Sequence, residues 1–173
     1  MERPETRYAK TPEGVYIAYQ VVGDGPIDLL YLPGYTSNLF WQWELLSYAR
    51  FLEQLASFSR LILVDRRGSG LSDRFSPQDL PPLEDLADDL RTVMEAVGSE
   101  RIALLATEDG CFVCSMFAAT HPDRTDAVVL YGMDPGEPGV GLAHPSPERS
   151  PSWKSSTTRW TSTGAPVSTR DGT

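Results

Sequence analysis

The sequence predicts an α/β fold, a mostly parallel β-sheet with helices on both faces. Short apolar runs of strand length alternate with longer segments whose apolar residues recur at helical spacing. Turn signals that contain glycine or proline separate many of these segments. Continuous apolar strands are typical of parallel sheets, because such sheets are buried on both faces. At 173 residues, the chain has the length of one domain with a sizeable core.

The amino-terminal half of this pattern contains three strands and one helix. Residues 15–22 and 27–32 are apolar or β-branched runs, each followed by a turn signal that contains glycine and proline. A helix is predicted over about 44–57, because its apolar residues share one face: Phe51, Leu52, Leu55 and Phe58. Residues 61–64 form the third apolar strand.

The following segments repeat the alternation. A helix is predicted over 83–97, because it begins after two prolines and stops at Gly98. Residues 102–105 and 127–131 are apolar strands, and a helix over 111–120 lies between them.

The composition changes near residue 136. Residues 1–135 hold the strand and helix pattern, which we expect to end after about the sixth strand of the sheet. In residues 136–173, 23 of the 38 residues are Ser, Thr, Pro or Gly. Such a segment buries too little apolar surface to offset the entropy of ordering it. We therefore expect a core domain over 1–135 and a disordered tail over 136–173.

Charge and hydropathy narrow the classes of partner. The formal net charge of −9 argues against binding to nucleic acid or to anionic membranes. No run of apolar residues approaches the length of a membrane span, and the charged start Met1–Glu5 lacks the apolar stretch of a signal peptide. These features predict a cytoplasmic protein that binds neither nucleic acid nor membrane. No motif predicts a cofactor or a metal.

Distinctive residues follow three of the predicted strands. They are the segments 33–36 (Pro-Gly-Tyr-Thr), 65–73 (Asp-Arg-Arg-Gly-Ser-Gly-Leu-Ser-Asp) and 106–110 (Ala-Thr-Glu-Asp-Gly). Ligand sites of open α/β sheets gather at the carboxyl ends of the strands. The sequence therefore predicts a site where these segments meet.

In their order and spacing, these segments resemble the α/β-hydrolase fold family, of the AB hydrolase-1 type. The segment 65–73 is similar to the turn after the fourth strand, 33–36 to the His-Gly loop with Pro33 in place of the histidine, and 106–110 to the nucleophile elbow. Asn38, Trp41, Trp43 and residues 118–124 add a similarity to bacterial members encoded beside nucleotide-cyclase or regulatory domains.

The resemblance covers about residues 7–134 and implies the amino-terminal part of a hydrolase domain. A complete domain adds two strands, a lid, and the loops that carry the catalytic acid and histidine. We expect that the tail arose from a frameshift or truncation, with the missing acid and histidine half encoded downstream in another frame.

The resemblance also implies the roles of particular residues. Glu108 occupies the position of the nucleophile, and the backbone N–H groups of Tyr35 and Asp109 correspond to the oxyanion donors. We expect a pocket for a small apolar ligand beside Glu108, lined by Gly34, Trp41 and Trp43.

Two interpretations of Glu108 stay open. A carboxylate is a competent nucleophile toward carbon, and members of this family that open epoxides or cleave haloalkanes use aspartate at the elbow. The other interpretation is a degenerate elbow, because glutamate is one methylene longer and near-attack geometry tolerates small displacements poorly. A base is also needed. His121 is expected to be a structural residue at a helix end, and His144 lies in the tail.

Two further patterns favour structural roles. Cys111 and Cys114 are three apart in a predicted helix, so both thiols are expected to pack as small apolar groups in the core. Gly68-x-Gly70 lacks the third glycine and the helix of a nucleotide-binding turn, and it is expected to shape a loop.

Three hypotheses for function follow. The first is a catalytically impaired protein that binds a small apolar ligand or a partner domain. The second is an active ester, epoxide or haloalkane hydrolase that uses Glu108. The third is a truncated product with no function of its own. A sheet that ends at residues 127–131 also has an open edge, which predicts self-association.

Overall fold

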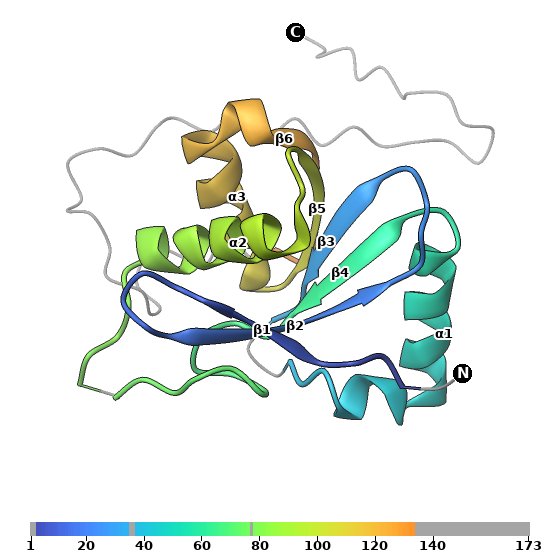
Figure 1. The fold of residues 1–173 in the computed structure, drawn as a ribbon, viewed down its shortest axis with the longest axis horizontal. Coiled ribbons are helices and arrows are strands. Elements are labelled where there is room, and N and C mark those ends of the chain that lie inside the picture. Colours follow the sequence, from blue (N-terminus) through green and yellow to red (C-terminus); the bar gives the residue numbers. More distant parts are fainter. Residues whose placement is uncertain (1–2, 35–36, 77, 134–173) are drawn as a thin grey trace, which may run out of the picture. The chain divides into compact units, whose positions relative to one another are not determined.

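The computed structural model describes residues 3–34, 37–76 and 78–133, and the tail predicted over 136–173 lies outside them. Figure 1 shows the elements in chain order: β1 (Arg7–Lys10), β2 (Tyr16–Val22), β3 (Asp28–Leu32), η1 (Trp41–Trp43), α1 (Leu46–Ala56), β4 (Arg60–Val64), α2 (Leu83–Val97), β5 (Ile102–Thr107), α3 (Gly110–Thr120), η2 (Pro122–Arg124) and β6 (Thr125–Tyr131).

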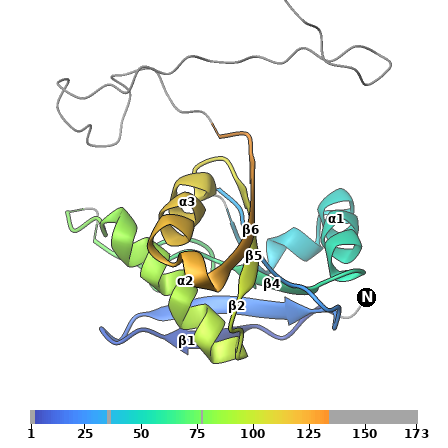
Figure 2. The ribbon, with the colours of Figure 1, turned by 90° about the horizontal axis from the view of Figure 1, so that it is seen from above.

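These strands form one sheet in the order β1-β2-β4-β3-β5-β6. The four strands β4, β3, β5 and β6 pair with one another in parallel, in that order across the sheet. Strand β2 pairs antiparallel with both β1 and β4. Helices α2 and α3 lie on one face of the sheet and α1 lies on the other, as Figure 2 shows. The predicted α/β fold is confirmed, with helices on both faces of a mostly parallel sheet.

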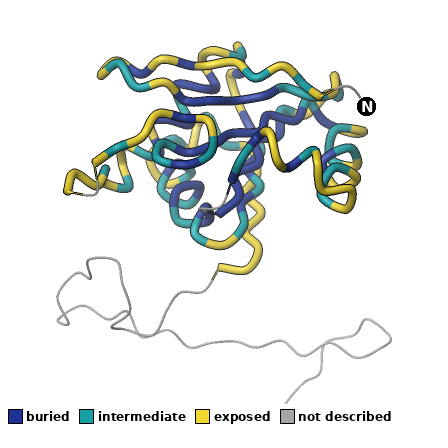
Figure 3. The backbone as a smooth tube through the Cα atoms, turned by 90° about the horizontal axis from the view of Figure 1, so that it is seen from below, coloured by how far each residue is buried: buried dark blue, intermediate teal, exposed yellow. Residues whose placement is uncertain are grey.

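Each face of the sheet has its own core. Under α2 and α3, buried side chains such as Leu90, Met94 and Phe117 pack on Leu30 and Leu104 of the central strands. On the α1 face, the largest buried side chains are Leu39, Leu52, Leu61 and Leu63, together with Tyr31. The central strands are therefore buried on both sides (Figure 3), which explains their continuous apolar sequences.

A charged cluster joins the amino ends of β3 and β4 to the turn after α2. Arg60 donates to both Asp28 oxygens, with Nε–Oδ1 at 2.6 Å and Nη2–Oδ2 at 2.5 Å, and Ser99 Oγ donates to Oδ2 at 2.6 Å. The hydrogen bond from Arg60 is the largest cause that lowers the pKa of Asp28 below its usual value. The turn itself contains Gly98, which has a φ of 69° and ends α2 in the left-handed conformation. The sequence predicted the end of the helix at this residue.

Strand β6 is an edge of the described sheet. Its residues are exposed or half-buried along their whole length, and Val129 and Tyr131 keep 55% and 73% of their surface exposed. An open edge of this kind is a site for pairing with another strand. Self-association through it stays a prediction.

Among the described residues, no helix has the length and apolar character needed to cross a membrane. A cytoplasmic location stays a prediction.

Candidate functional site

A cavity of about 550 Å³ lies at the carboxyl end of the parallel strands. Three strand ends contribute to its lining, with Pro33 and Gly34 after β3, Thr107 and Glu108 at the end of β5, and Tyr131 and Gly132 at the end of β6. Residues from β3, η1, α1 and the segments just before η1 and α1 complete it. A cavity of this size and position is typical of small-molecule sites in α/β proteins.

Glu108 occupies a sharp turn between β5 and α3. Its φ of 53° is the one positive value at a non-glycine position among the described residues. The Glu108 N–H donates to the Tyr131 carbonyl at 3.0 Å, and its own carbonyl accepts from Cys111 N–H at 3.2 Å. The left-handed conformation is unfavourable for a residue with a Cβ, so the surrounding structure must hold it. It leaves the Glu108 side chain exposed at the cavity.

Two glycines allow the turn to lie close to the end of β3. A Cβ on Gly110 would lie 2.6 Å from the Leu32 carbonyl oxygen and 2.9 Å from that of Pro33. A Cβ on Gly34 would lie 2.3 Å from Glu108 Oε2 and 2.8 Å from Asp109 Oδ1. The start of α3 and the two carboxylates therefore occupy space that larger residues at 34 and 110 would fill.

The two neighbouring carboxylates have different surroundings. Arg66, from the turn after β4, donates to Asp109 Oδ2 at 2.6 Å, and its side chain is 6% exposed. Among the described residues, no basic side chain lies within ion-pair distance of Glu108. Asp109 is thus neutralised by a nearly buried guanidinium, whereas the negative charge of Glu108 faces the cavity.

Two tyrosines line the α1 side of the cavity. The hydroxyls of Tyr31 and Tyr48 lie 2.7 Å apart and share a hydrogen bond. Burial is the largest cause that raises the pKa of Tyr48 above its usual value, and the Tyr31 hydrogen bond and the charge of Glu108 act in the same direction. Tyr48 is therefore a neutral phenol in this site and not a base.

The turn after β4 has a structural role. Asp65 is fully buried, and its Oδ2 accepts from the N–H groups of Leu39 at 3.0 Å and Leu71 at 2.8 Å. A Cβ on Gly70 would lie 1.9 Å from the same oxygen, so this position requires glycine. These hydrogen bonds connect the loop after β3 to the turn after β4, and they hold in place a loop that lines the cavity.

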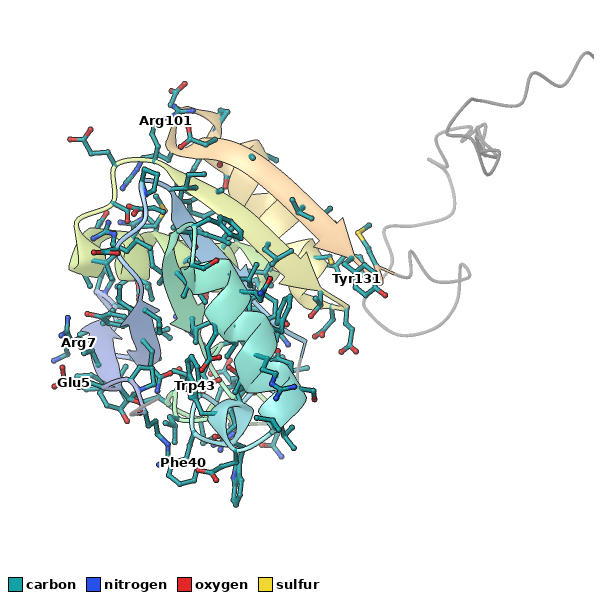
Figure 4. All side chains as sticks on the ribbon, turned by 90° about the vertical axis from the view of Figure 1, so that its right-hand side faces the viewer. Glu5, Arg7, Phe40, Trp43, Arg101 and Tyr131 are labelled. Atoms are coloured by element: carbon teal, nitrogen blue, oxygen red, sulfur yellow. The ribbon has the colours of Figure 1, made fainter. Side chains whose placement is uncertain are left out.

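Two of the three pocket residues predicted from the sequence lie in the lining of the cavity. Gly34 and Trp41 line the cavity. Trp43, which we expected beside them, is not in the lining, because its indole N–H donates to Gln20 Oε1 at 2.8 Å on another side of η1. A 3₁₀-helix has three residues per turn, so residues two apart point in different directions. Figure 4 shows Trp43 well apart from Tyr131, which is the last residue of β6 and lines the cavity.

The predicted oxyanion donors are only partly described. The N–H of Asp109 belongs to the residue that precedes α3, directly after the elbow. Tyr35 lies outside the described residues.

His121 is the one histidine among the described residues, and it lies at the far end of α3 from Glu108. Its ring stacks on Phe117 with centroids 4.7 Å apart, and its Nδ1 is 2.9 Å from Thr120 Oγ1. The 11 residues of α3 separate it from the elbow by about 16 Å. The prediction of a structural histidine at a helix end is confirmed. His144 lies outside the described residues.

Cys111 and Cys114 are both fully buried and not joined by a disulfide. Burial raises the pKa of the Cys114 thiol to about 12, and burial also raises that of Cys111. The prediction that both pack in the core is confirmed. Within the described part of the chain, no group of three or more His, Cys, Asp or Glu residues could hold a metal ion.

The chain belongs to the α/β-hydrolase fold family. The sequence model of this family matches residues 29–163, which is most of the chain and extends past the described residues. Epoxide hydrolase 1 of Caenorhabditis elegans is 29% identical over 131 residues, which cover 75% of this chain and 30% of that protein. The mouse serine hydrolase BPHL is 31% identical over 126 residues, which cover 69% and 40%.

Solved structures agree with this assignment. Cfl2 of Burkholderia cenocepacia superposes with a TM-score of 0.63 at 26% identity, over 83% of this chain and 46% of that one. An epoxide hydrolase of Vigna radiata, at 24% identity and a TM-score of 0.64, shows the same fold over 75% of this chain and 39% of that one. The chain spans less than half the length of each of these four relatives.

Proposed function

We propose that this chain binds a small molecule in the cavity beside Glu108 and does not complete hydrolytic turnover on its own. The observation that carries the proposal is the pairing of a formed cavity with an elbow that holds a carboxylate. Ordinary ester hydrolysis needs a hydroxyl or thiol nucleophile, because acyl transfer to a carboxylate would give an anhydride.

The surroundings of Glu108 support binding without turnover. An alkyl ester formed on this carboxylate would need a base to activate the water that releases it. His121 is about 16 Å away, at the other end of α3. No other described residue is a histidine.

The test is a panel of an aryl ester, an aryl epoxide and a haloalkane, assayed for turnover and for binding. We expect saturable binding by calorimetry and no turnover above that of a Glu108→Gln variant. Glu100→Gln, an exposed glutamate at the amino end of β5, serves as the matched control. Catalytic turnover that Glu108→Gln abolishes and Glu100→Gln leaves intact would refute the proposal.

The alternative is a hydrolase that uses Glu108 as a carboxylate nucleophile, and the position of Glu108 at the elbow favours it. In that case, a Glu108 oxygen attacks an epoxide carbon, the carbon–oxygen bond of the ring breaks, and the released oxygen takes a proton from water. Intact-protein mass spectrometry after incubation with the aryl epoxide would then show a gain of one epoxide mass, absent in Glu108→Gln.

Cooperative thermal unfolding of the purified protein would count against the third hypothesis, a truncated product with no function of its own.

A further inference from the structure

We infer that the cavity beside Glu108 selects an organic cation, a primary or substituted ammonium group attached to an apolar body. This inference rests on the proposed function, because it names the chemical class of the ligand that the same cavity binds. Three features of the lining carry it: its charge, its aromatic content and a buried acceptor without a partner.

The charge of the lining is negative. Glu108 is the one charged side chain among the described lining residues. The nearby Arg66 does not offset it, because that guanidinium is paired with Asp109 at 2.6 Å and is 6% exposed. A ligand in this cavity therefore meets an exposed carboxylate that lacks an ion-pair partner among the described residues, and a positive charge on the ligand is favoured.

The rest of the lining is largely aromatic. Tyr31 and Tyr48 line the inner wall, and Trp41 and Tyr131, which are 62% and 73% exposed, lie at the opening. Aromatic faces attract cations, and a carboxylate beside several aromatic rings is a typical arrangement for binding ammonium groups. The same rings provide apolar surface for the body of the ligand.

One polar group of the lining is a buried acceptor without a hydrogen-bond partner. Asn38 Oδ1 already accepts from the N–H groups of Phe40 and Trp41, at 3.0 and 3.1 Å, and the two tyrosine hydroxyls bond to each other. Gln42, which lines the cavity and is 7% exposed, has a buried Oε1 with no hydrogen-bond partner. An unpaired buried acceptor costs free energy, and a donor on the ligand that reached it would recover part of that cost.

The experiment compares three probes with the same apolar body: 4-phenylbutylammonium, 4-phenylbutanol and 4-phenylbutanoate. We expect calorimetry to give an affinity for the ammonium about five- to tenfold higher than for the alcohol, with the carboxylate the weakest. Glu108→Gln should remove this preference by lowering the affinity for the ammonium to about that for the alcohol. Trp41→Leu should weaken the ammonium more than the alcohol, and Glu100→Gln should match the wild type.

The outcomes separate the two proposals. Equal binding of all three probes would overturn the cationic ligand class and leave the proposed binding function standing. Binding of none of them would overturn the proposed function together with this inference. An ammonium preference that survives in Glu108→Gln would overturn the assigned role of Glu108.

Discussion

Substitution by glycine usually destabilises a protein, but the positive φ of Glu108 predicts the opposite effect at this position. Glu108→Gly should stabilise the protein, because glycine adopts a φ of 53° without the clash that a Cβ creates. The left-handed conformation costs a residue with a Cβ about 1–2 kcal/mol. Glycine also increases the entropy of the unfolded chain, which lowers the free energy of unfolding by about 0.4–1 kcal/mol and offsets part of this gain.

The net expectation is a gain of about 0.5–1 kcal/mol in the free energy of unfolding, from the difference between these two effects. For a domain of this size, that gain raises Tm by about 1–4 °C. Little apolar burial is lost, because the Glu108 side chain is exposed. The assay is urea unfolding followed by circular dichroism, with a thermal melt as a second readout.

Glu100→Gly is the matched control, since Glu100 is also exposed and does not have a positive φ. This variant should lose about 0.4–1 kcal/mol, because it has only the entropic effect. If Glu108→Gly is destabilised as much as Glu100→Gly, the reasoning from backbone strain is wrong.

Three further changes test other parts of the fold. Asp28→Asn should lower the free energy of unfolding by about 1.5–3 kcal/mol at neutral pH. Because the folded pKa of Asp28 lies below the unfolded value, its stabilising effect is present above the unfolded pKa and lost as pH falls through the folded one. Urea unfolding should show the variant and wild type converging in acid, and a constant difference across pH would contradict this. Gly110→Ala should cost about 1–3 kcal/mol, because backbone oxygens at 2.6 and 2.9 Å cannot easily move. The measurement is urea unfolding, and a loss close to zero would argue against this steric cause. Val129→Lys should abolish a concentration-dependent increase in the mass measured by light scattering, since it places a charge on the β6 edge. A wild type that stays monomeric at all concentrations would exclude the predicted self-association.

Most of the fold could be predicted from the sequence because its strands are buried on both faces. The apolar runs that became β3, β4 and β5 are distinct in composition from the amphipathic helices α1 and α2. Strand β1 was missed, because only Ala9 of its four residues is buried and no apolar run marks it.

The site was predicted in outline but not in its lining. The elbow at Glu108 could be found because its segment follows one strand and precedes one helix. Tyr31 and Tyr48 were missed, since a strand residue and a helix residue of this kind also suit an ordinary core. The three-residue η1 decides that Trp41 faces the cavity and Trp43 does not, and its geometry has no signal in the sequence.

The hydrogen bond from Glu108 N–H to the Tyr131 carbonyl links the cavity to the motion of the sheet edge. Edge strands open more often than central strands, so β6 should exchange its amide hydrogens faster than β3 or β5. Each opening near Tyr131 removes the acceptor of the Glu108 N–H and frees the turn to relax its unfavourable φ. A ligand that holds Glu108 in place should therefore slow hydrogen exchange at the end of β6, and any chain that pairs with β6 should tighten the cavity in return.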